Sequence, residues 1–298
     1  MVKYRLHKTG ISVAALSVIV LGAVSKPQCY QSKKNKMNKL NTLFFLEKTL
    51  DKSIEYSSKL TFDKKYPQHL FLISLYCRVV ELTHSCTILM RGEIISGVPI
   101  ILRTVLETFA DLKNLSADEN YVNFMRATYM KEWFRIFKEA QKGGNAYLTR
   151  ISRIENLNQV YAEHENELNG LKKNHYTPLT PGQRFERAGM VDEYLSIYNF
   201  LCSHSHSDIR SLYSRYTRIT GDDFTVICFK DPTPHDIALY STTLCDILTD
   251  ATVIIHKSLN SGLNSDVATL NSEWEELKSK LLTKNQEEEN RTMRNDQS

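Results

Sequence analysis

Apolar residues recur along most of this chain every three or four positions, the spacing that places side chains on one face of a helix. The pattern is clearest between residues 98 and 115, and we expect the other helices to pack around this segment. Its apolar positions are Val98, Ile101, Leu102, Val105, Phe109 and Leu112. The same pattern predicts further helices over residues 40–60, 67–90, 118–142, 147–173, 181–219, 234–255 and 265–282.

These segments predict an all-α fold, a bundle of seven or eight mostly long antiparallel helices. Proline and glycine, which interrupt helices, number only 7 and 11 in 298 residues, so long helices are expected. At most one short extended segment is predicted, near residues 224–229, after a Gly-Asp-Asp turn. We expect a single helical domain over residues 37–283 and a disordered, charged tail over residues 284–298.

Residues 1–36 differ in composition from the rest of the chain. An uncharged apolar run over residues 10–25 follows three basic residues, as in a signal peptide that would be cut after Ser25. Lysines follow this run closely, and positive charge in that place disfavours export. Three interpretations remain open: a signal peptide, an anchor that contacts a membrane through residues 10–25, and an upstream extension of a chain that starts at Met37. We expect the main domain to be cytoplasmic.

The formal net charge of +4 does not indicate nucleic-acid binding by the folded part. Seven basic residues and no acidic ones lie in residues 1–36, so the remainder of the chain carries a formal charge of −3. A basic patch would have to be local to hold a phosphate backbone.

Polar residues form one arc on the helix predicted over residues 98–115. At 100° of rotation per residue, Glu107 lies about 40° and Asp111 about 80° from Arg103. Arg103 and Glu107 stand one turn apart at the edge of this arc. They form either part of a site or a boundary ion pair, which would contribute only a few tenths of a kcal/mol in this orientation.

Residues 191–219 carry an apolar stripe that includes Tyr198 and persists through the run Cys-Ser-His-Ser-His-Ser-Asp. We therefore expect a single helix here, or two pieces kept in phase. In that geometry His206 borders the stripe and His204 lies on the far side, so the two cannot bind one metal ion, and no metal site is predicted. His206 is the candidate for a site-lining imidazole, and the alternative is a core histidine satisfied by a hydrogen bond.

Three arginines alternate with two tyrosines over residues 210–218. Such a patch can hold phosphates while tyrosines stack on bases, which makes Arg210 and Tyr213 candidate substrate-binding residues. The arginines fan around the helix, however, and the tyrosines belong to the apolar stripe. A solvated helix face is therefore the alternative.

Two short motifs stand out among these candidates. One is Leu-Arg-Thr-Val-Leu-Glu followed by an aromatic residue and Asp-Leu, at residues 102–112, and the other is Tyr-x-x-Leu-x-x-x-x-His-Ser, at residues 198–207. Together they resemble a bacterial family catalogued as a domain of unknown function, DUF5677, and the resemblance spans about residues 40–256. It implies a helical domain. Cys202 stands where the family usually has serine.

The expected placement of Arg and His on antiparallel helices is also distantly similar to the HEPN domains. Many of those domains are metal-independent ribonucleases or toxins of defence systems, with Arg and His four to six residues apart on one helix. Here only Arg78 and His84 match that spacing. Helical geometry separates them by about 120°, so we treat the match as chance.

The leading hypothesis is a nucleic-acid-acting or nucleotide-binding HEPN-like domain, whose most specific form is a metal-independent ribonuclease of a bacterial defence or toxin system. Arg103 would neutralise a phosphate, Glu107 would orient Arg103 or accept a proton, and His206 would act as general acid or base. RNA or a nucleotide is then the expected partner. No cofactor is predicted, since the sequence has no glycine-rich phosphate loop.

The alternative hypothesis is a non-catalytic helical interaction module, as a homodimer or as a membrane-anchored protein. In that case the same three residues would form a buried network that fixes the register of the helices. The sequence leaves open whether the protein is an enzyme.

Overall fold

The computed structural model describes residues 40–206, 208–221 and 223–295 of the chain. These residues are mostly helical and include one small two-stranded sheet, so the predicted all-α fold is confirmed. The predicted N-terminal segment, residues 1–36, lies outside the described residues. In chain order the elements are α2 (Leu40–Ser57), α3 (Pro67–Arg91), a 3-10 turn (Ile95–Gly97), α4 (Val98–Ala117), α5 (Tyr121–Lys142), a 3-10 turn (Ala146–Leu148), α6 (Thr149–Ser152), α7 (Leu157–Lys173), α8 (Pro181–Arg187), α9 (Val191–Glu193), a π-helical turn (Tyr194–Tyr198), α10 (Asn199–Ser205), α11 (Ile209–Tyr216), β1 (Thr217–Thr220), β2 (Asp223–Val226), α12 (Pro234–Ser258) and α13 (Asn264–Asn295).

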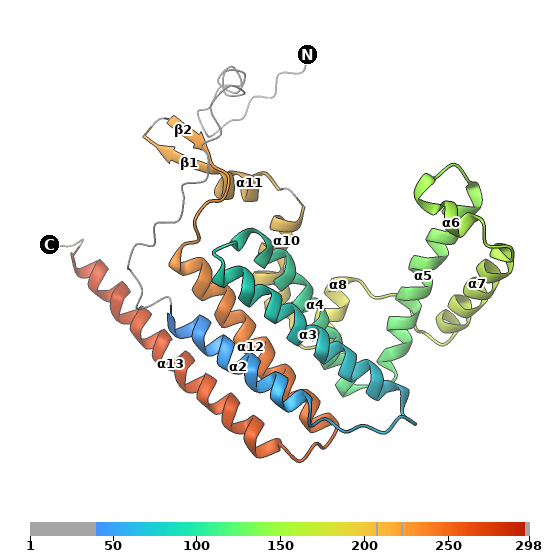
Figure 1. The fold of residues 1–298 in the computed structure, drawn as a ribbon, viewed down its shortest axis with the longest axis horizontal. Coiled ribbons are helices and arrows are strands. Elements are labelled where there is room, and N and C mark those ends of the chain that lie inside the picture. Colours follow the sequence, from blue (N-terminus) through green and yellow to red (C-terminus); the bar gives the residue numbers. More distant parts are fainter. Residues whose placement is uncertain (1–39, 207, 222, 296–298) are drawn as a thin grey trace.

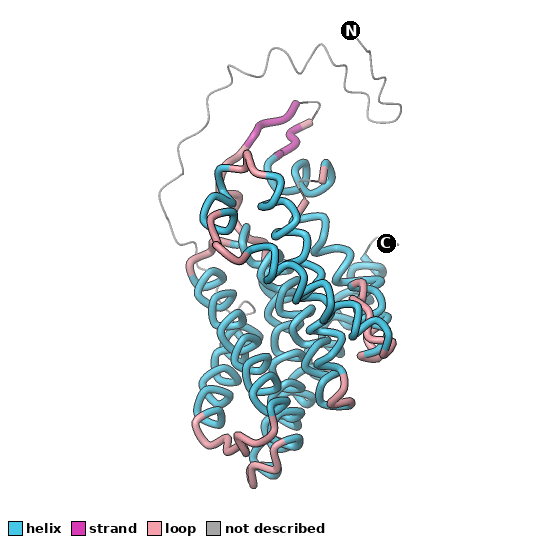
Figure 2. The backbone as a smooth tube through the Cα atoms, turned by 90° about the vertical axis from the view of Figure 1, so that its right-hand side faces the viewer, coloured by secondary structure: helices cyan, strands magenta, loops and turns pink. Residues whose placement is uncertain are grey.

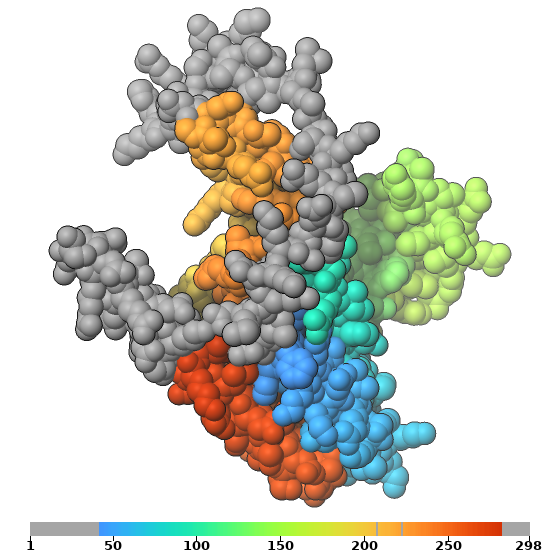
Figure 3. Space-filling model, turned by 60° about the vertical axis from the view of Figure 1, so that its left-hand side comes forward, coloured from blue at the N-terminus to red at the C-terminus, as the bar shows by residue number. Residues whose placement is uncertain are grey.

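Helix α4 is central to the larger group of helices, as its apolar pattern predicted. It packs against α3, α12, α10 and α8 (Figure 1). Its side chains Leu102, Val105 and Leu112 are fully buried. Helix α12 also contacts α2 and α13, and the C-terminal helix lies beside α2 in the space-filling view, although the two are far apart in the sequence (Figure 3). The core therefore joins segments from both ends of the described chain around α4 and α12.

Helices α5, α6 and α7 form a projection from one side of the main group (Figures 1 and 3). Helix α5 packs chiefly against α7, and it contacts α4 much less. Two small apolar clusters stabilise this projection, separate from the main core: one of Ala127, Leu168 and Leu171, and one of Phe137, Ala140 and Leu157. The division of the chain into an N-terminal segment, one domain and a tail stays a prediction.

Several helices begin where local sequence signals place them. Proline occupies the first turn of α3, α4, α8 and α12, where the missing N–H has no helical partner to lose. Thr180 and Gln183 form a capping box at the start of α8, and Thr233 and Asp236 form another at the start of α12. These signals fix the entry of α8, which carries Arg184 toward α4.

The helix predicted over residues 147–173 was wrong in one respect. It is divided into α6 and α7 by a turn at residues 153–156. The turn lets Leu148 and Ile151 pack beside Leu157 against Phe137 of α5. Tertiary packing here outweighs a helical pattern that is continuous in the sequence.

The helix predicted over residues 181–219 is divided into several pieces, and of the two alternatives for residues 191–219 the single helix was wrong. Gly189 ends α8 with a φ of 65°, a left-handed conformation that favours glycine. His206 ends α10, and Asp208 caps α11 by accepting the N–H of Arg210 at 2.8 Å. Asp208 is a short polar residue whose side chain competes for backbone hydrogen bonds, so a new helix starts here and the apolar stripe is interrupted. The continuous apolar periodicity of the sequence concealed this cap.

The predicted extended segment exists, but its partner was not predicted. Strand β2 pairs antiparallel with β1, which lies where the sequence predicted the end of a helix. β1 is Thr-Arg-Ile-Thr, and β-branched residues favour the extended backbone. The hairpin stands beyond one end of the bundle (Figure 2).

Helix α13 extends to Asn295, past the predicted end at residue 282. No proline or glycine follows residue 263, and Glu, Lys, Gln and Arg are good helix formers. Apolar periodicity therefore underestimated its length, because the segment continues without an apolar stripe.

Two of the described helices, α3 and α12, are long and apolar enough to cross a membrane by length and composition alone. Both contribute side chains to the main core, and core helices pass the same test. Localisation therefore stays a prediction.

Candidate functional site

Arg103 and Glu107 lie one turn apart on α4, on the side that faces α10 and α8. Arg103 Nε is 3.3 Å from Glu107 Oε1, and the two side chains are 24% and 26% exposed. The Nε atom is buried and makes no aligned hydrogen bond, so this contact is an ion pair held by charge. The pair thus stands at the boundary between core and solvent, as its position on the polar arc predicted.

Tyr198 connects this pair to the segment that packs over it. Its hydroxyl donates to Glu107 Oε1 at 2.7 Å and accepts from Arg103 Nη2 at 3.2 Å. The guanidinium carbon of Arg103 also lies 5.4 Å from the centre of the Tyr198 ring. Burial, and then the hydrogen bond to Glu107, raise the pKa of Tyr198, so the phenol keeps its proton and remains a donor.

His206 closes the open end of this group. Its Nε2 atom lies 3.4 Å from Arg103 Nη1, and its side chain is exposed. The structure therefore brings together Arg103, Glu107 and His206, the three residues that the sequence nominated. His206 reaches this place as the residue that ends α10, rather than from within a continuous helix.

The polar contacts continue along α4 through Arg184 of α8. Arg184 Nε is 3.1 Å from Asp111 Oδ1, and its Nη2 donates to the carbonyl of Glu107 at 3.1 Å. The amide of Asn114 donates to the carbonyl of Arg184 at 2.9 Å, which fixes α8 on α4. Tyr121, at the start of α5, donates its hydroxyl to the same Asp111 oxygen at 2.6 Å.

We call Arg103, Glu107, Tyr198, His206, Arg184 and Asp111 the α4 network. Its two arginines balance its two carboxylates, so the network is neutral when His206 is neutral. Burial raises the pKa of Asp111, while Arg184 and then the Tyr121 hydroxyl oppose that change. Charges that are partly removed from water are thus paired within the network.

Sequence reasoning missed three members of this network for different reasons. Asp111 was placed on the polar arc but given no role. Tyr198 was assigned to the apolar stripe, which its ring does join, since a helical pattern does not reveal what the phenol tip contacts. Arg184 was missed because the sequence predicted that a helix starts at Thr180 but not where that helix packs. The tertiary fold determines how Arg184 approaches α4.

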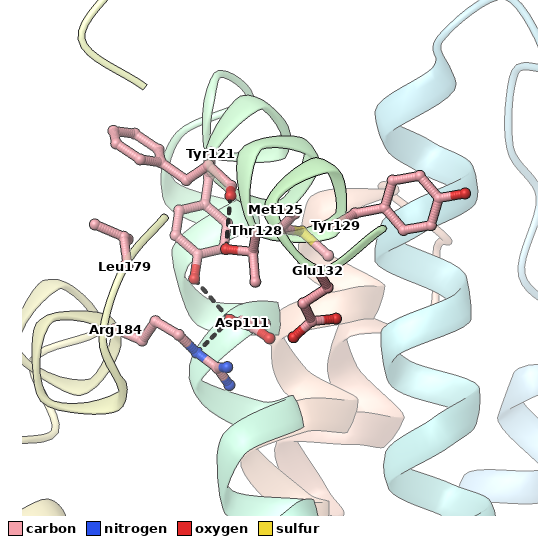
Figure 4. Close-up of a pocket in the computed structure, with 9 residues that line it drawn as sticks. Asp111, Tyr121, Met125, Thr128, Tyr129, Glu132, Leu179 and Arg184 are labelled. Carbon is pink, nitrogen blue, oxygen red and sulfur yellow. Dashed lines mark hydrogen bonds and ion pairs between the residues drawn. The ribbon is translucent and has the colours of Figure 1, made fainter. Parts of the chain in front are cut away.

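A cavity of about 230 Å³ adjoins the far end of the network from His206. Asp111, Tyr121 and Arg184 line it from the network side, and Met125 and Glu132 of α5 line it from the other (Figure 4). The network therefore has an exposed imidazole at one end and a partly apolar cavity at the other.

Arg210 and Tyr213 do not join the α4 network. Both are exposed on α11, and Arg210 lines a different cavity of about 300 Å³ together with His204 and Phe200. Burial and then the charge of Arg215 lower the pKa of His204. His204 and His206 thus belong to different surfaces, as their separation around the helix predicted, and substrate binding by Arg210 and Tyr213 stays a prediction.

The side chains that could ligate a metal ion are dispersed over the described part of the chain. No three His, Cys, Asp or Glu side chains within it are grouped so that they could hold such an ion.

The α4 network lies within a segment that comparison with known families identifies. Residues 69–224 match the sequence profile of DUF5677, described as a family of unknown function. The chain belongs to this family. The match covers both motifs of the network, at residues 102–112 and 198–207, so the geometry described above is that of a DUF5677 domain. No curated protein and no solved structure matches the chain significantly.

Proposed function

We propose that this DUF5677 protein acts on RNA, with the contact between Arg103 and His206 at the centre of the site. One observation supports the proposal: the exposed imidazole of His206 lies 3.4 Å from the guanidinium of Arg103, whose orientation is fixed by other contacts. Glu107 and Tyr198 contact other nitrogens of the same guanidinium and fix its orientation. A preoriented cation beside a proton acceptor suits chemistry at a phosphodiester.

The reaction that best fits these groups is cleavage by the neighbouring 2′-hydroxyl. In this proposal the 2′-oxygen attacks phosphorus and its proton goes to His206. The bond from phosphorus to the 5′-oxygen breaks, and the leaving oxygen takes a proton from water. Arg103 stabilises the negative charge on the phosphoryl oxygens, and Glu107 is a positioning residue that acts through Arg103.

Two neighbouring residues extend the proposed contact with RNA. Arg210 makes no ion pair within the described residues, so its guanidinium can pair with a second phosphate. Tyr213 is 46% exposed and can stack on a base. They stand on α11, which begins three residues after His206.

The proposal also includes a distant relationship to the HEPN domains and a role in a bacterial defence or toxin system. In support, an Arg and a His from two packed helical segments meet at one surface. Here the two residues come from α4 and the end of α10, whereas HEPN ribonucleases carry them on one helix. The pair that does match HEPN spacing, Arg78 and His84, is exposed on α3.

This difference supplies a matched control for the decisive experiment. Purified full-length protein, His206→Ala and His84→Ala would be incubated with single-stranded RNA, and the products would be separated by size. We expect cleavage by the wild type and His84→Ala and its loss in His206→Ala, with circular dichroism verifying that each variant is folded. Equal cleavage by all three proteins would identify a contaminating nuclease, and loss in His84→Ala alone would move the site to α3.

The second candidate function is the non-catalytic interaction module in its homodimeric form. Large exposed apolar side chains gather between residues 191 and 229, including Leu195, Ile209 and Phe229 at 65%, 83% and 76% exposure. Exposed apolar surface of this kind favours association. Sedimentation velocity would compare the wild type with Ile209→Ser, and a wild type that stays monomeric at high concentration contradicts this candidate.

A further inference from the structure

At the cavity beside the far end of the α4 network, the closest contacts of the Asp111 carboxylate are made through one of its two oxygens. Tyr121 and Arg184 both contact Asp111 through Oδ1, at 2.6 and 3.1 Å. Within the described residues, no hydrogen bond reaches Oδ2 of Asp111. Figure 4 shows this second oxygen directed into the cavity, away from Arg184. One acceptor of a largely buried carboxylate is therefore open to a ligand.

A second carboxylate faces the same space. Glu132 of α5 lines the cavity, and Figure 4 shows its carboxyl group pointing inward, toward Asp111. Glu132 makes no ion pair or hydrogen bond with another described side chain. Its exposure places it at the mouth, whereas Asp111 lies deeper.

The charges lining the cavity do not balance. Asp111 and Glu132 contribute two negative charges and Arg184 one positive charge. Arg184 is engaged by Asp111 Oδ1 and by the carbonyl of Glu107, so its guanidinium is directed to the network. The space between the two carboxylates thus has a net negative potential, which favours a cation over an anion.

The remaining walls indicate which kind of cation fits. Met125 and Leu179 supply aliphatic surface, and Tyr121 and Phe124 supply aromatic rings. A metal ion would gain nothing from such walls, whereas an organic cation can bury its carbon chain there and place its charge near an aromatic ring. The cavity therefore combines two hydrogen-bond acceptors with an apolar floor.

We propose that this cavity binds an alkylammonium ion, with its N–H groups shared between Asp111 Oδ2 and Glu132 and its carbon chain against Met125 and Leu179. This chemistry has two sources, a free aliphatic diamine or the lysine side chain of a partner protein. The site is independent of the proposed action on RNA, because it uses no contact made by His206.

Isothermal titration calorimetry of the full-length protein tests the site with defined probes. The probes are 1,4-diaminobutane for the free amine, lysine blocked at its amino and carboxyl ends for a partner side chain, and 1-butanol as a neutral molecule of similar shape. We expect heat of binding from at least one amine and none from the alcohol. The amine that binds more tightly identifies the source.

Variants assign the binding to these two carboxylates. Glu132→Gln removes a charge from an exposed position, so folding should be unaffected, and we expect the amine to bind about tenfold more weakly, as for a lost charged hydrogen bond. Asp111→Asn should have a similar effect, and Glu139→Gln, on the same helix but outside the cavity, should have none. Absence of binding by both amines, equal binding of the alcohol, or unchanged affinity in Glu132→Gln would each overturn the proposal.

Discussion

The Nη1 atom of Arg103 lies 3.4 Å from the Nε2 atom of His206, although 103 positions separate the two residues in the sequence. The packing of α10 on α4 sets this distance, and the end of α10 places the imidazole at the surface. An arginine has only donors, so the contact is favourable when the facing imidazole nitrogen carries no proton. The lone pair of that nitrogen can take a proton from a substrate once the contact with Arg103 is released.

The first prediction concerns the shape of the Arg103 side chain. Arg103→Lys keeps the positive charge, but its single nitrogen cannot contact Tyr198 and His206 together. We expect the rate of RNA cleavage to fall at least about tenfold, while the melting temperature changes by only a few degrees. Arg126→Lys, at an exposed position on α5, is the matched control. Normal cleavage by Arg103→Lys would show that the planar guanidinium is not needed.

The second prediction concerns the hydroxyl of Tyr198. Tyr198→Phe keeps the buried ring and removes a group that bonds both Glu107 and Arg103. We expect a loss of about 2 kcal/mol in the free energy of unfolding, measured in urea, and a melting temperature lower by roughly 6 °C. Tyr213→Phe, on an exposed face of α11, should change neither quantity. If the two variants were equally stable, the Tyr198 hydroxyl would contribute nothing to the network.

The helices and the central position of α4 could be predicted because periodicity and capping are local properties of the sequence. The approach of Arg103 and His206 could also be anticipated, because α10 is helical up to Ser205 and helical geometry is valid to that point. The contacts of Tyr198 could not be predicted, since its ring belongs to the core pattern and only the fold decides what its hydroxyl meets. Arg184 joins through α8, whose docking on α4 depends on distant residues such as Asn114.

The errors reflect the limits of apolar periodicity. Apolar periodicity reports which face is buried, and it is insensitive to turns that keep neighbouring pieces on the same face. The turn at residues 153–156 is of this kind, since Leu148 and Ile151 before it and Leu157 after it join one apolar cluster. After His206, by contrast, the stripe residues Ile209 and Leu212 are exposed, so there the periodicity also misplaced the buried face. Gly189 and Asp208 carried local signals for two of the breaks, and the stripe of apolar residues outweighed them in the sequence-based prediction.

The third prediction concerns the structural role of Glu107. Glu107→Ala leaves Arg103 and Arg184 without the carboxylate between them, and both are largely buried. We expect a loss of about 2 kcal/mol in the free energy of unfolding, a value reduced for partial exposure. The melting temperature measured by circular dichroism should fall by several degrees. An unchanged or raised melting temperature would contradict a network that fixes the register of the helices.

The fourth prediction concerns His256, a fully buried residue of α12. Its ring lies 5.9 Å from that of Tyr56 and 6.5 Å from that of Tyr76, and its Nδ1 atom is 2.7 Å from Ser261 Oγ. Burial lowers the pKa of His256 below its ordinary value of 6.5. In the window below 6.5 the unfolded chain therefore binds more protons than the folded protein.

Stability should accordingly rise with pH up to about 6.5 and gain nothing further from this residue above it. Urea unfolding at a series of pH values would measure the dependence, and His256→Gln should make it shallower whatever its own stability. The comparison uses the slope with pH, so a general loss of stability in the variant does not affect it. An identical slope in both proteins would show that His256 is not the titrating group.

The last prediction compares two glycines in different backbone conformations. Gly189 ends α8 with a φ of 65°, and a Cβ added there meets no atom within 4 Å, so the cost of Gly189→Ala comes from the backbone alone. We expect a loss of about 1 kcal/mol in the free energy of unfolding. Gly170 lies inside α7, where an added Cβ also meets open space, and Gly170→Ala should stabilise the protein by up to about 1 kcal/mol. Urea unfolding of both variants would give opposite signs if Gly189 is what stops α8 and turns the chain toward Tyr198. Equal signs would mean that the turn forms as readily without glycine, and that the α8 to α9 junction is set by packing on α4.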